Sequence, residues 1–77
     1  MQVSIQLFGD LRDYLPDKQR GRASLEVASG AVVQDVLDTL GIDRPVVVAV
    51  NEEHDIDHTA PLLPGDKVMV FGLSAGG

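Results

Sequence analysis

One segment of the chain has the periodicity of a helix, and it lies in the middle of the sequence. Its apolar side chains recur at the i, i+3, i+4 spacing of a single stripe: Val32, Val33, Val36, Leu37 and Leu40. Ser29 precedes this stripe and is the expected N-cap, and Gly41 follows it, as a left-handed C-terminal cap would. A single short helix cannot bury its apolar stripe alone, so we expect it to pack on a sheet.

The segments on both sides of the helix have the patterns of strands. Residues 2–8 and 22–28 alternate polar and apolar side chains, which is the period of a strand with one buried face. Residues 46–50 are continuously apolar, as in a strand that is covered on both faces. Residues 67–71 form the last predicted strand, after a Pro-Gly-Asp turn at 64–66.

The predicted order is therefore strand, strand, helix, strand, strand. This order indicates the α+β class, with a mixed four- to five-stranded sheet and one main helix on one face. It fits the β-grasp architecture of ubiquitin, although the pattern alone does not exclude other arrangements of the same elements. We expect residues 1–77 to be a single domain with a flexible C-terminal tail over residues 72–77. A domain of this size has little room for a deep active-site cleft.

Composition excludes several classes of function. The chain has no cysteine, which excludes disulfides, thiolate metal sites and cysteine nucleophiles, so any sulfur chemistry must use a sulfur atom from outside. A formal net charge of −6 argues against nucleic acid as a partner. There is no apolar run long enough to cross a bilayer and no signal-peptide pattern at the start, so no membrane partner and a cytoplasmic location are expected.

Two histidines are the only candidates for a metal site. His54 and His58 have a four-residue spacing that could bind a metal on a helix, but they lie in an acidic, loop-like segment with Asp55 and Asp57. We interpret this segment as a solvated surface and predict no metal site.

Several short segments, taken in order, carry a resemblance to a known family. They are Leu7-Phe8, Leu11-Arg12, the helix with Leu40-Gly41, Val48-Ala49-Val50-Asn51, Leu62 or Leu63, Gly65-Asp66-Lys67-Val68 and the closing Gly76-Gly77. Over essentially its whole length the chain resembles the MoaD/ThiS family of ubiquitin-like sulfur carriers, and most closely the small subunit of molybdopterin synthase. Two positions differ: Glu52 stands where the family usually has Gly, and the tail before the glycines lacks the frequent Pro-Pro. The second difference weakens the assignment to molybdenum cofactor synthesis.

The resemblance implies a sulfur-carrying substrate or subunit rather than an enzyme. In the family, a ubiquitin-activating-type adenylyltransferase adenylates the terminal carboxylate with ATP, and persulfide sulfur then converts it to a thiocarboxylate. Gly77 would carry these groups as transient modifications, with no bound cofactor. Gly76 would let the tail enter a narrow partner site, because glycine has no Cβ.

The resemblance also implies a sulfur-accepting partner, here one like the large subunit of molybdopterin synthase in molybdenum or tungsten cofactor synthesis. Carriers for thiamine thiazole, cysteine or tRNA thiolation are alternatives. So is a ubiquitin-like modifier that is conjugated to target proteins through Gly77, and so is a binding module that shares only the fold.

A docking surface can be predicted from the alternation in the last strand. Val68 and Val70 suit the helix side, which places Met69 and Phe71 on the other face. In a β-grasp fold the first and last strands are parallel neighbours, so Phe8 would lie close to Phe71 and form an apolar cluster that could dock a partner. The tail residues Leu73 and Ala75 complete the predicted partner-binding set: Phe8, Met69, Phe71, Leu73 and Ala75. The alternative is that residues 51–63 fold over this cluster as a second small core.

Overall fold

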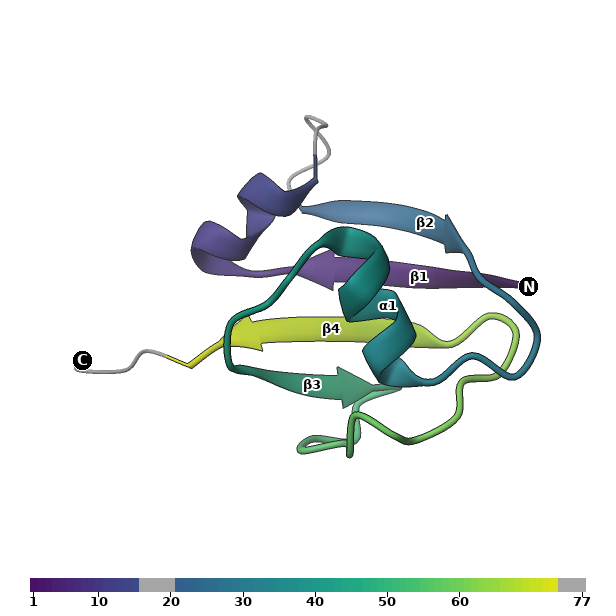
Figure 1. The fold of residues 1–77 in the computed structure, drawn as a ribbon. Coiled ribbons are helices and arrows are strands. Elements are labelled where there is room, and N and C mark those ends of the chain that lie inside the picture. The colour runs from purple at the N-terminus through teal and green to yellow at the C-terminus, as the bar shows by residue number, and fades with distance from the viewer. Residues whose placement is uncertain (16–20, 74–77) are drawn as a thin grey trace.

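The computed structural model describes residues 1–15 and 21–73 of the chain. In Figure 1, the helix labelled α1 lies across one face of the sheet. In chain order the elements are β1 (Gln2–Leu7), the 3-10 helix η1 (Gly9–Tyr14), β2 (Arg22–Glu26), α1 (Val33–Leu40), β3 (Val46–Val50) and β4 (Lys67–Gly72). The predicted order of strands and helix is confirmed. Of the predicted tail over 72–77, Gly72 is the last residue of β4, Leu73 follows it, and residues 74–77 lie outside the described residues.

The first and last strands lie side by side at the centre of the sheet, as predicted. The described residues form four strands in the order β2-β1-β4-β3. Strands β1 and β4 are parallel, with Ile5 opposite Val68 and Leu7 opposite Val70, whereas β2 and β3 pair antiparallel at the two sides. This mixed sheet with one helix on one face is the β-grasp arrangement.

The core lies between α1 and the helix-facing side of the sheet. Val33 and Val36 of the helix are fully buried, and so are Val68 and Val70 of β4. The apolar run of β3 is covered on both faces at its centre, because neighbours on opposite faces, Val48 and Ala49, are both buried. The centre of the strand therefore agrees with the prediction that residues 46–50 are covered on both faces, whereas Val47 and Val50 are only half-buried.

The start of the helix differs from the prediction. Ser29 lies in a turn, and the helix begins four residues later, so its assignment as the N-cap is wrong. The first helical N–H groups are satisfied by distant backbone carbonyls instead: Val33 donates to Ala60 (3.0 Å) and Gln34 donates to His58 (2.8 Å). A neighbouring segment thus supplies these two acceptors, and the Asp35 carboxylate in the first turn accepts from the N–H of the N-cap residue Val32 at 2.9 Å.

The end of the helix agrees with the prediction. Gly41 has φ 79° and ψ 19°, which is the left-handed region. Its N–H donates to the carbonyl of Asp38 at 3.1 Å, and the N–H of Ile42 donates to that of Leu37 at 2.9 Å. This is the Schellman arrangement, in which glycine avoids the steric penalty of a Cβ.

The segment between β3 and β4 runs along the edge of the sheet. The N–H of Ile56 donates to Val48 on the free side of β3 (2.9 Å), and Ala60 caps the helix as described above. Phe8 and Phe71 on the far face are only half-buried. The alternative in which this segment encloses the two rings as a second core is therefore wrong.

Candidate functional site

A stacked aromatic pair marks the end of β4. Phe8 follows β1, and its N–H donates to the carbonyl of Val70 at 3.2 Å, which holds it against the neighbouring strand. The rings of Phe8 and Phe71 lie with centroids 4.5 Å apart and planes 10° from parallel. The predicted proximity of the two rings is confirmed, and the geometry is within the range of favourable aromatic pairs.

The aromatic pair belongs to a larger apolar area on the sheet face away from α1. In the β3–β4 register, Val47 lies opposite Phe71 and Ala49 lies opposite Met69. These residues alternate with the helix-facing valines, so they share the outer face. Ala49 is fully buried, and the half-buried residues around it form what we call the apolar patch: Phe8, Val47, Met69 and Phe71.

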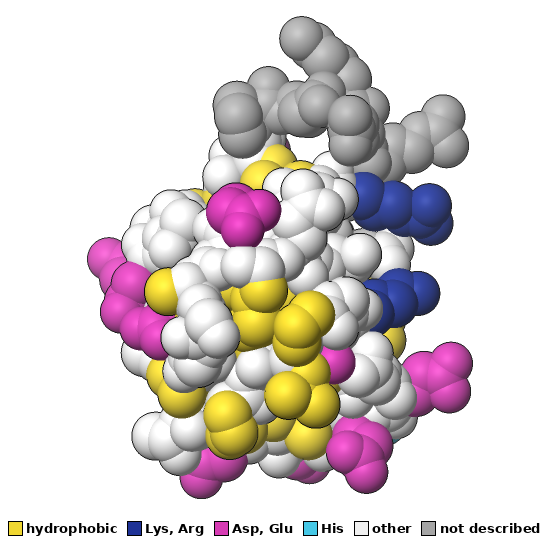
Figure 2. Space-filling view, turned by 90° about the vertical axis from the view of Figure 1, so that its right-hand side faces the viewer, with side chains coloured by type: hydrophobic (Ala, Val, Ile, Leu, Met, Phe, Trp, Pro, Cys, Tyr) yellow, Lys and Arg dark blue, Asp and Glu magenta, His cyan; other side chains and the backbone are white. Residues whose placement is uncertain are grey.

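The rest of the outer face is polar. A shallow hollow of about 480 Å³ over β1 and β2 is lined by Ser4, Gln6, Arg22, Ser24 and Lys67, together with the edges of two apolar residues. Figure 2 views the molecule from the end where β1 begins, and its Lys and Arg side chains gather along one side. The outer face is therefore divided into an apolar half over β3 and the later part of β4 and a polar half over β1, β2 and the start of β4.

A second hollow, of about 300 Å³, lies where β4 ends. Phe8 and Phe71 form part of its wall, and Gly72 and Leu73 form another part. Leu73 is 54% exposed, and its N–H donates to the carbonyl of Pro45 at 3.4 Å. The chain thus leaves the sheet directly beside the apolar patch, with an exposed leucine at the point of departure.

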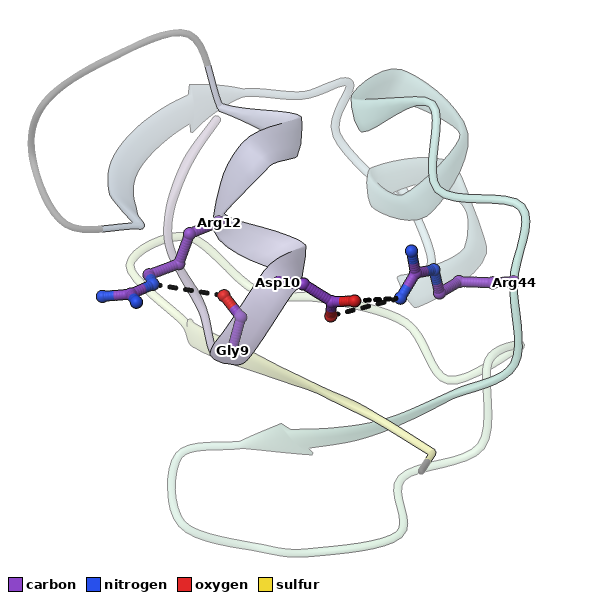
Figure 3. Close-up of polar contacts among 4 residues, drawn as sticks. All are labelled: Gly9, Asp10, Arg12 and Arg44. Atoms are coloured by element: carbon purple, nitrogen blue, oxygen red, sulfur yellow. Dashed lines mark hydrogen bonds and ion pairs between the residues drawn. The ribbon is translucent and has the colours of Figure 1, made fainter. Parts of the chain in front are cut away.

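An ion pair forms the polar rim of this second hollow. The guanidinium of Arg44 lies 3.1 Å from a carboxylate oxygen of Asp10 (Figure 3). It also lies 5.8 Å from the centroid of the Tyr14 ring. Hydrogen bonding to Asp10 raises the pKa of Arg44, so the side chain stays charged. Both partners of the ion pair are exposed, and such a pair contributes little to stability. Its role here is to place one cation and one anion beside the start of the tail.

The structure describes only some of the predicted site residues. It brings Phe8, Met69 and Phe71 together on one face, and it places Leu73 beside them. Ala75, Gly76 and Gly77 lie outside the described residues.

The remaining surface offers no metal centre in the described part of the chain. Within residues 1–15 and 21–73, no group of three or more His, Cys, Asp or Glu side chains could hold a metal ion. His54 is exposed, and the carbonyl of His58 is used at the start of α1. None of the described helices is long and apolar enough to cross a membrane.

A polar network at the start of β4 was missed by the sequence interpretation. Asp66 is the only buried polar side chain among the described residues, and it accepts from the Asn51 side-chain amide (2.9 Å) and from the N–H of Leu63 (2.8 Å). The carbonyl oxygen of the same Asn51 side chain accepts from the N–H of Lys67 at 3.0 Å. Both Asn51 and Asp66 lie in segments that carry the family resemblance, which was the available signal. The network fixes the point at which β4 enters the sheet.

The loop beside this network uses a left-handed backbone. Asn51 has φ 50° and Glu52 has φ 73°. Glycine tolerates such angles, whereas a residue with a Cβ is strained by roughly 1–2 kcal/mol. Glu52 stands where the family usually has glycine, so this chain has a side chain at a position where the backbone is strained.

Comparison with known proteins agrees with this geometry. The model of the ThiS family matches residues 5–77, which include β4, the second half of β1 and the aromatic pair. The chain belongs to the ThiS family. No curated protein sequence matches it.

Two solved structures have the same fold as this ThiS-family chain. The crystal structure of SAMP1 from Haloferax volcanii superposes with a TM-score of 0.75 at 20% identity, over 100% of both chains. The crystal structure of H. volcanii small archaeal modifier protein 1 gives 0.74 at 20% identity, over 92% of this chain and 95% of that one. At this identity the similarity establishes the β-grasp fold.

Proposed function

We propose that this ThiS-family protein is a sulfur carrier whose Gly77 carboxylate is converted to a thiocarboxylate. The observation that supports this most directly is the position of the apolar patch beside the point where the chain leaves β4. A partner that docks on Phe8 and Phe71 would have the tail directed into its own active site. A docked tail reacts as if intramolecular, which is the advantage of holding reactants in place.

The chemistry needs an activating enzyme, because a carboxylate is a poor electrophile. A Gly77 oxygen would attack the α-phosphate of ATP and release pyrophosphate, giving an acyl adenylate. The terminal sulfur of a persulfide would then attack the acyl carbon and displace AMP. A second thiol would cleave the resulting S–S bond, forming a disulfide and leaving the thiocarboxylate. All sulfur in this sequence comes from outside the chain, which contains no cysteine.

The proposed acceptor is a synthase subunit like the large subunit of molybdopterin synthase, with thiamine thiazole, cysteine or tRNA thiolation as the other carrier pathways. A second function, protein modification through Gly77, is favoured by a specific observation: the two structural neighbours are small archaeal modifier proteins. Both functions require the same activation step. They differ in the group that finally accepts the acyl carbon or the sulfur.

Intact mass spectrometry tests the proposal. The protein is incubated with its host's activating enzyme, ATP and a persulfide donor. A sulfur carrier gains the mass of one sulfur in place of one oxygen, and the gain disappears when Gly77 is deleted. Conjugates to other proteins without this gain would instead indicate a modifier.

A matched pair of glycine variants separates tail entry from folding. Gly76→Val should block the gain, because a branched side chain cannot enter a site shaped for glycine. Gly72→Ala is the control: a Cβ there would meet only Leu11, at an ordinary contact distance of 3.9 Å. If Gly76→Val gains sulfur as fast as the wild type, the terminal glycines do not act as proposed.

A further inference from the structure

The outer edge of β2 presents backbone groups that have no strand partner among the described residues. In the sheet, β2 pairs with β1 on one side only. The N–H of Leu7 bonds to Gly21 (2.7 Å) and the N–H of Val27 bonds to Met1 (2.8 Å), so the odd-numbered residues of this stretch face β1. In an antiparallel ladder the residues between them point the other way. The N–H and C=O groups of Arg22, Ser24 and Glu26 are therefore directed outward.

The side chains of these three residues form a symmetric charge pattern. Arg22, Ser24 and Glu26 are all exposed and share the outer face of the sheet. The cation lies two residues before the serine and the anion lies two residues after it. Charged residues on an edge strand normally oppose pairing with another strand. Here the two charges are opposite and equally spaced, so they are complementary to a reversed copy of the same strand.

From this pattern we infer that the partner of the β2 edge is a second copy of this chain, paired antiparallel about a two-fold axis at Ser24. In this register, Ser24 pairs with Ser24 of the second copy, and Arg22 pairs with Glu26 of the second copy in both directions. Every outward N–H and C=O of these residues then meets an outward group on the other copy. Opposite charges directly across a strand pair stabilise it.

The same charges select against the other ways of pairing two copies. A parallel pairing in register would set Arg22 beside Arg22 and Glu26 beside Glu26, and like charges across strands are destabilising. An antiparallel pairing shifted by two residues would set one charged residue of each copy opposite Ser24 and the other opposite a residue outside β2. In the register centred on Ser24, each charged side chain lies opposite an unlike charge and every outward backbone N–H and C=O has a partner.

The association is weak and reversible. A five-residue strand pair buries much less surface than the roughly 1,200 Å² of a small stable interface. Each copy also has a net charge of −6, which opposes close approach. The Glu26 carboxylate is already 2.9 Å from the amino group of Met1, yet its side chain is 72% exposed and can still accept from a second cation.

The paired form would leave the proposed carrier function intact. The apolar patch lies over β3 and β4 and at the end of β1, whereas the pairing edge is on the far side of β1. Two copies joined at β2 would present both patches on one face of a continuous sheet, each with its own tail. Pairing of two copies at the β2 edge therefore does not depend on sulfur transfer.

Sedimentation velocity and NMR from micromolar to millimolar concentration test this inference. We expect reversible dimer formation at the upper end, with concentration-dependent amide shifts confined to β2 and its neighbours. Arg22→Glu should weaken association about tenfold or more, because it replaces two attractions by two repulsions. The double exchange Arg22→Glu with Glu26→Arg should restore it. Lys67→Glu is the matched control, since it makes the same change in net charge on an exposed residue away from the edge.

A backbone variant gives an independent test. Ser24→Pro removes an outward N–H without removing a bond to β1, and proline is tolerated on an edge strand in this position. It should abolish dimer formation while circular dichroism shows the fold retained. The inference is overturned if the wild type stays monomeric at millimolar concentration, if the shifts map to Phe8 and Phe71, or if the double exchange fails to restore association.

Discussion

Replacement of Gly21 by alanine should destabilise the fold far more than the same change at Gly41. Both glycines have φ 79°, so the backbone strain imposed on an alanine is the same at the two positions. They differ in the space around them. A Cβ on Gly41 would have no neighbour within 4 Å, whereas one on Gly21 would lie 2.5 Å from the carbonyl oxygen of Leu7 and 2.6 Å from Cγ of Arg12.

The expected magnitudes follow from these two contributions. The left-handed conformation costs an alanine roughly 1–2 kcal/mol, and this is the whole effect expected at Gly41. At Gly21 the Arg12 side chain can move away, but the Leu7 oxygen is backbone at the end of β1, and Leu7 also donates its N–H to Gly21 at 2.7 Å. Overpacking of this kind costs about 1–3 kcal/mol more. The total at Gly21 is therefore about 2–5 kcal/mol.

Thermal and urea unfolding, followed by circular dichroism, measure the difference directly. For a domain of this size each kcal/mol lowers the melting temperature by about 4–8 °C. Gly41→Ala should therefore lose about 4–16 °C, and Gly21→Ala clearly more than that. Equal losses in the two variants would refute the reasoning, because they would mean that the overlap with the Leu7 carbonyl relaxes at no cost.

Three further predictions concern a strained loop, a titrating carboxylate and the apolar patch. Glu52→Gly should raise the free energy of unfolding by about 1 kcal/mol, since it relieves the left-handed strain at that residue; an unchanged urea midpoint would contradict this. Hydrogen bonds from the backbone and side chain of Thr59 lower the pKa of Asp57 below its ordinary value of 3.8. The stability that Asp57 adds is thus present above pH 3.8 and is lost as the pH falls through the lower folded pKa. Asp57→Ala should therefore melt at a lower temperature than the wild type at neutral pH and at the same temperature in strong acid. Phe8→Ala should weaken binding to the activating enzyme about tenfold or more in calorimetry, whereas Ser4→Ala on the polar half of the same face should leave it unchanged.

Alternation along the strands was sufficient to predict the sheet and its outer face. The side-chain period of a strand assigns Val70 to one face and Phe71 to the other without further information. The proximity of Phe71 to Phe8 needed one more element, the parallel pairing of the first and last strands. That pairing came from the resemblance to ubiquitin-like carriers, and the register confirms it. The roles of Gly76 and Gly77 stay predictions.

Contacts between residues distant in the sequence could not be predicted from local pattern. The first N–H groups of α1 donate to carbonyls of residues 58 and 60, which the local pattern does not reveal, so the prediction of Ser29 as the N-cap is wrong. Likewise, the bond between Asn51 and Asp66 joins two loops, and no periodicity relates two such positions. In both cases the acceptor or donor is brought into place only by the tertiary fold.

The central position of β4 has a consequence for how the protein is made. Strands β1 and β3 each pair with β4 and not with one another, so residues 67–72 join the two halves of the sheet. A chain interrupted before Lys67 would have a β1–β2 hairpin and an isolated valine-rich strand with nothing to cover its edges. Such strands are sites of aggregation. Long-range pairing of this kind also slows folding. The four-stranded sheet can therefore form only after the ribosome has synthesised β4. Every folded molecule has thus been translated at least through residue 72.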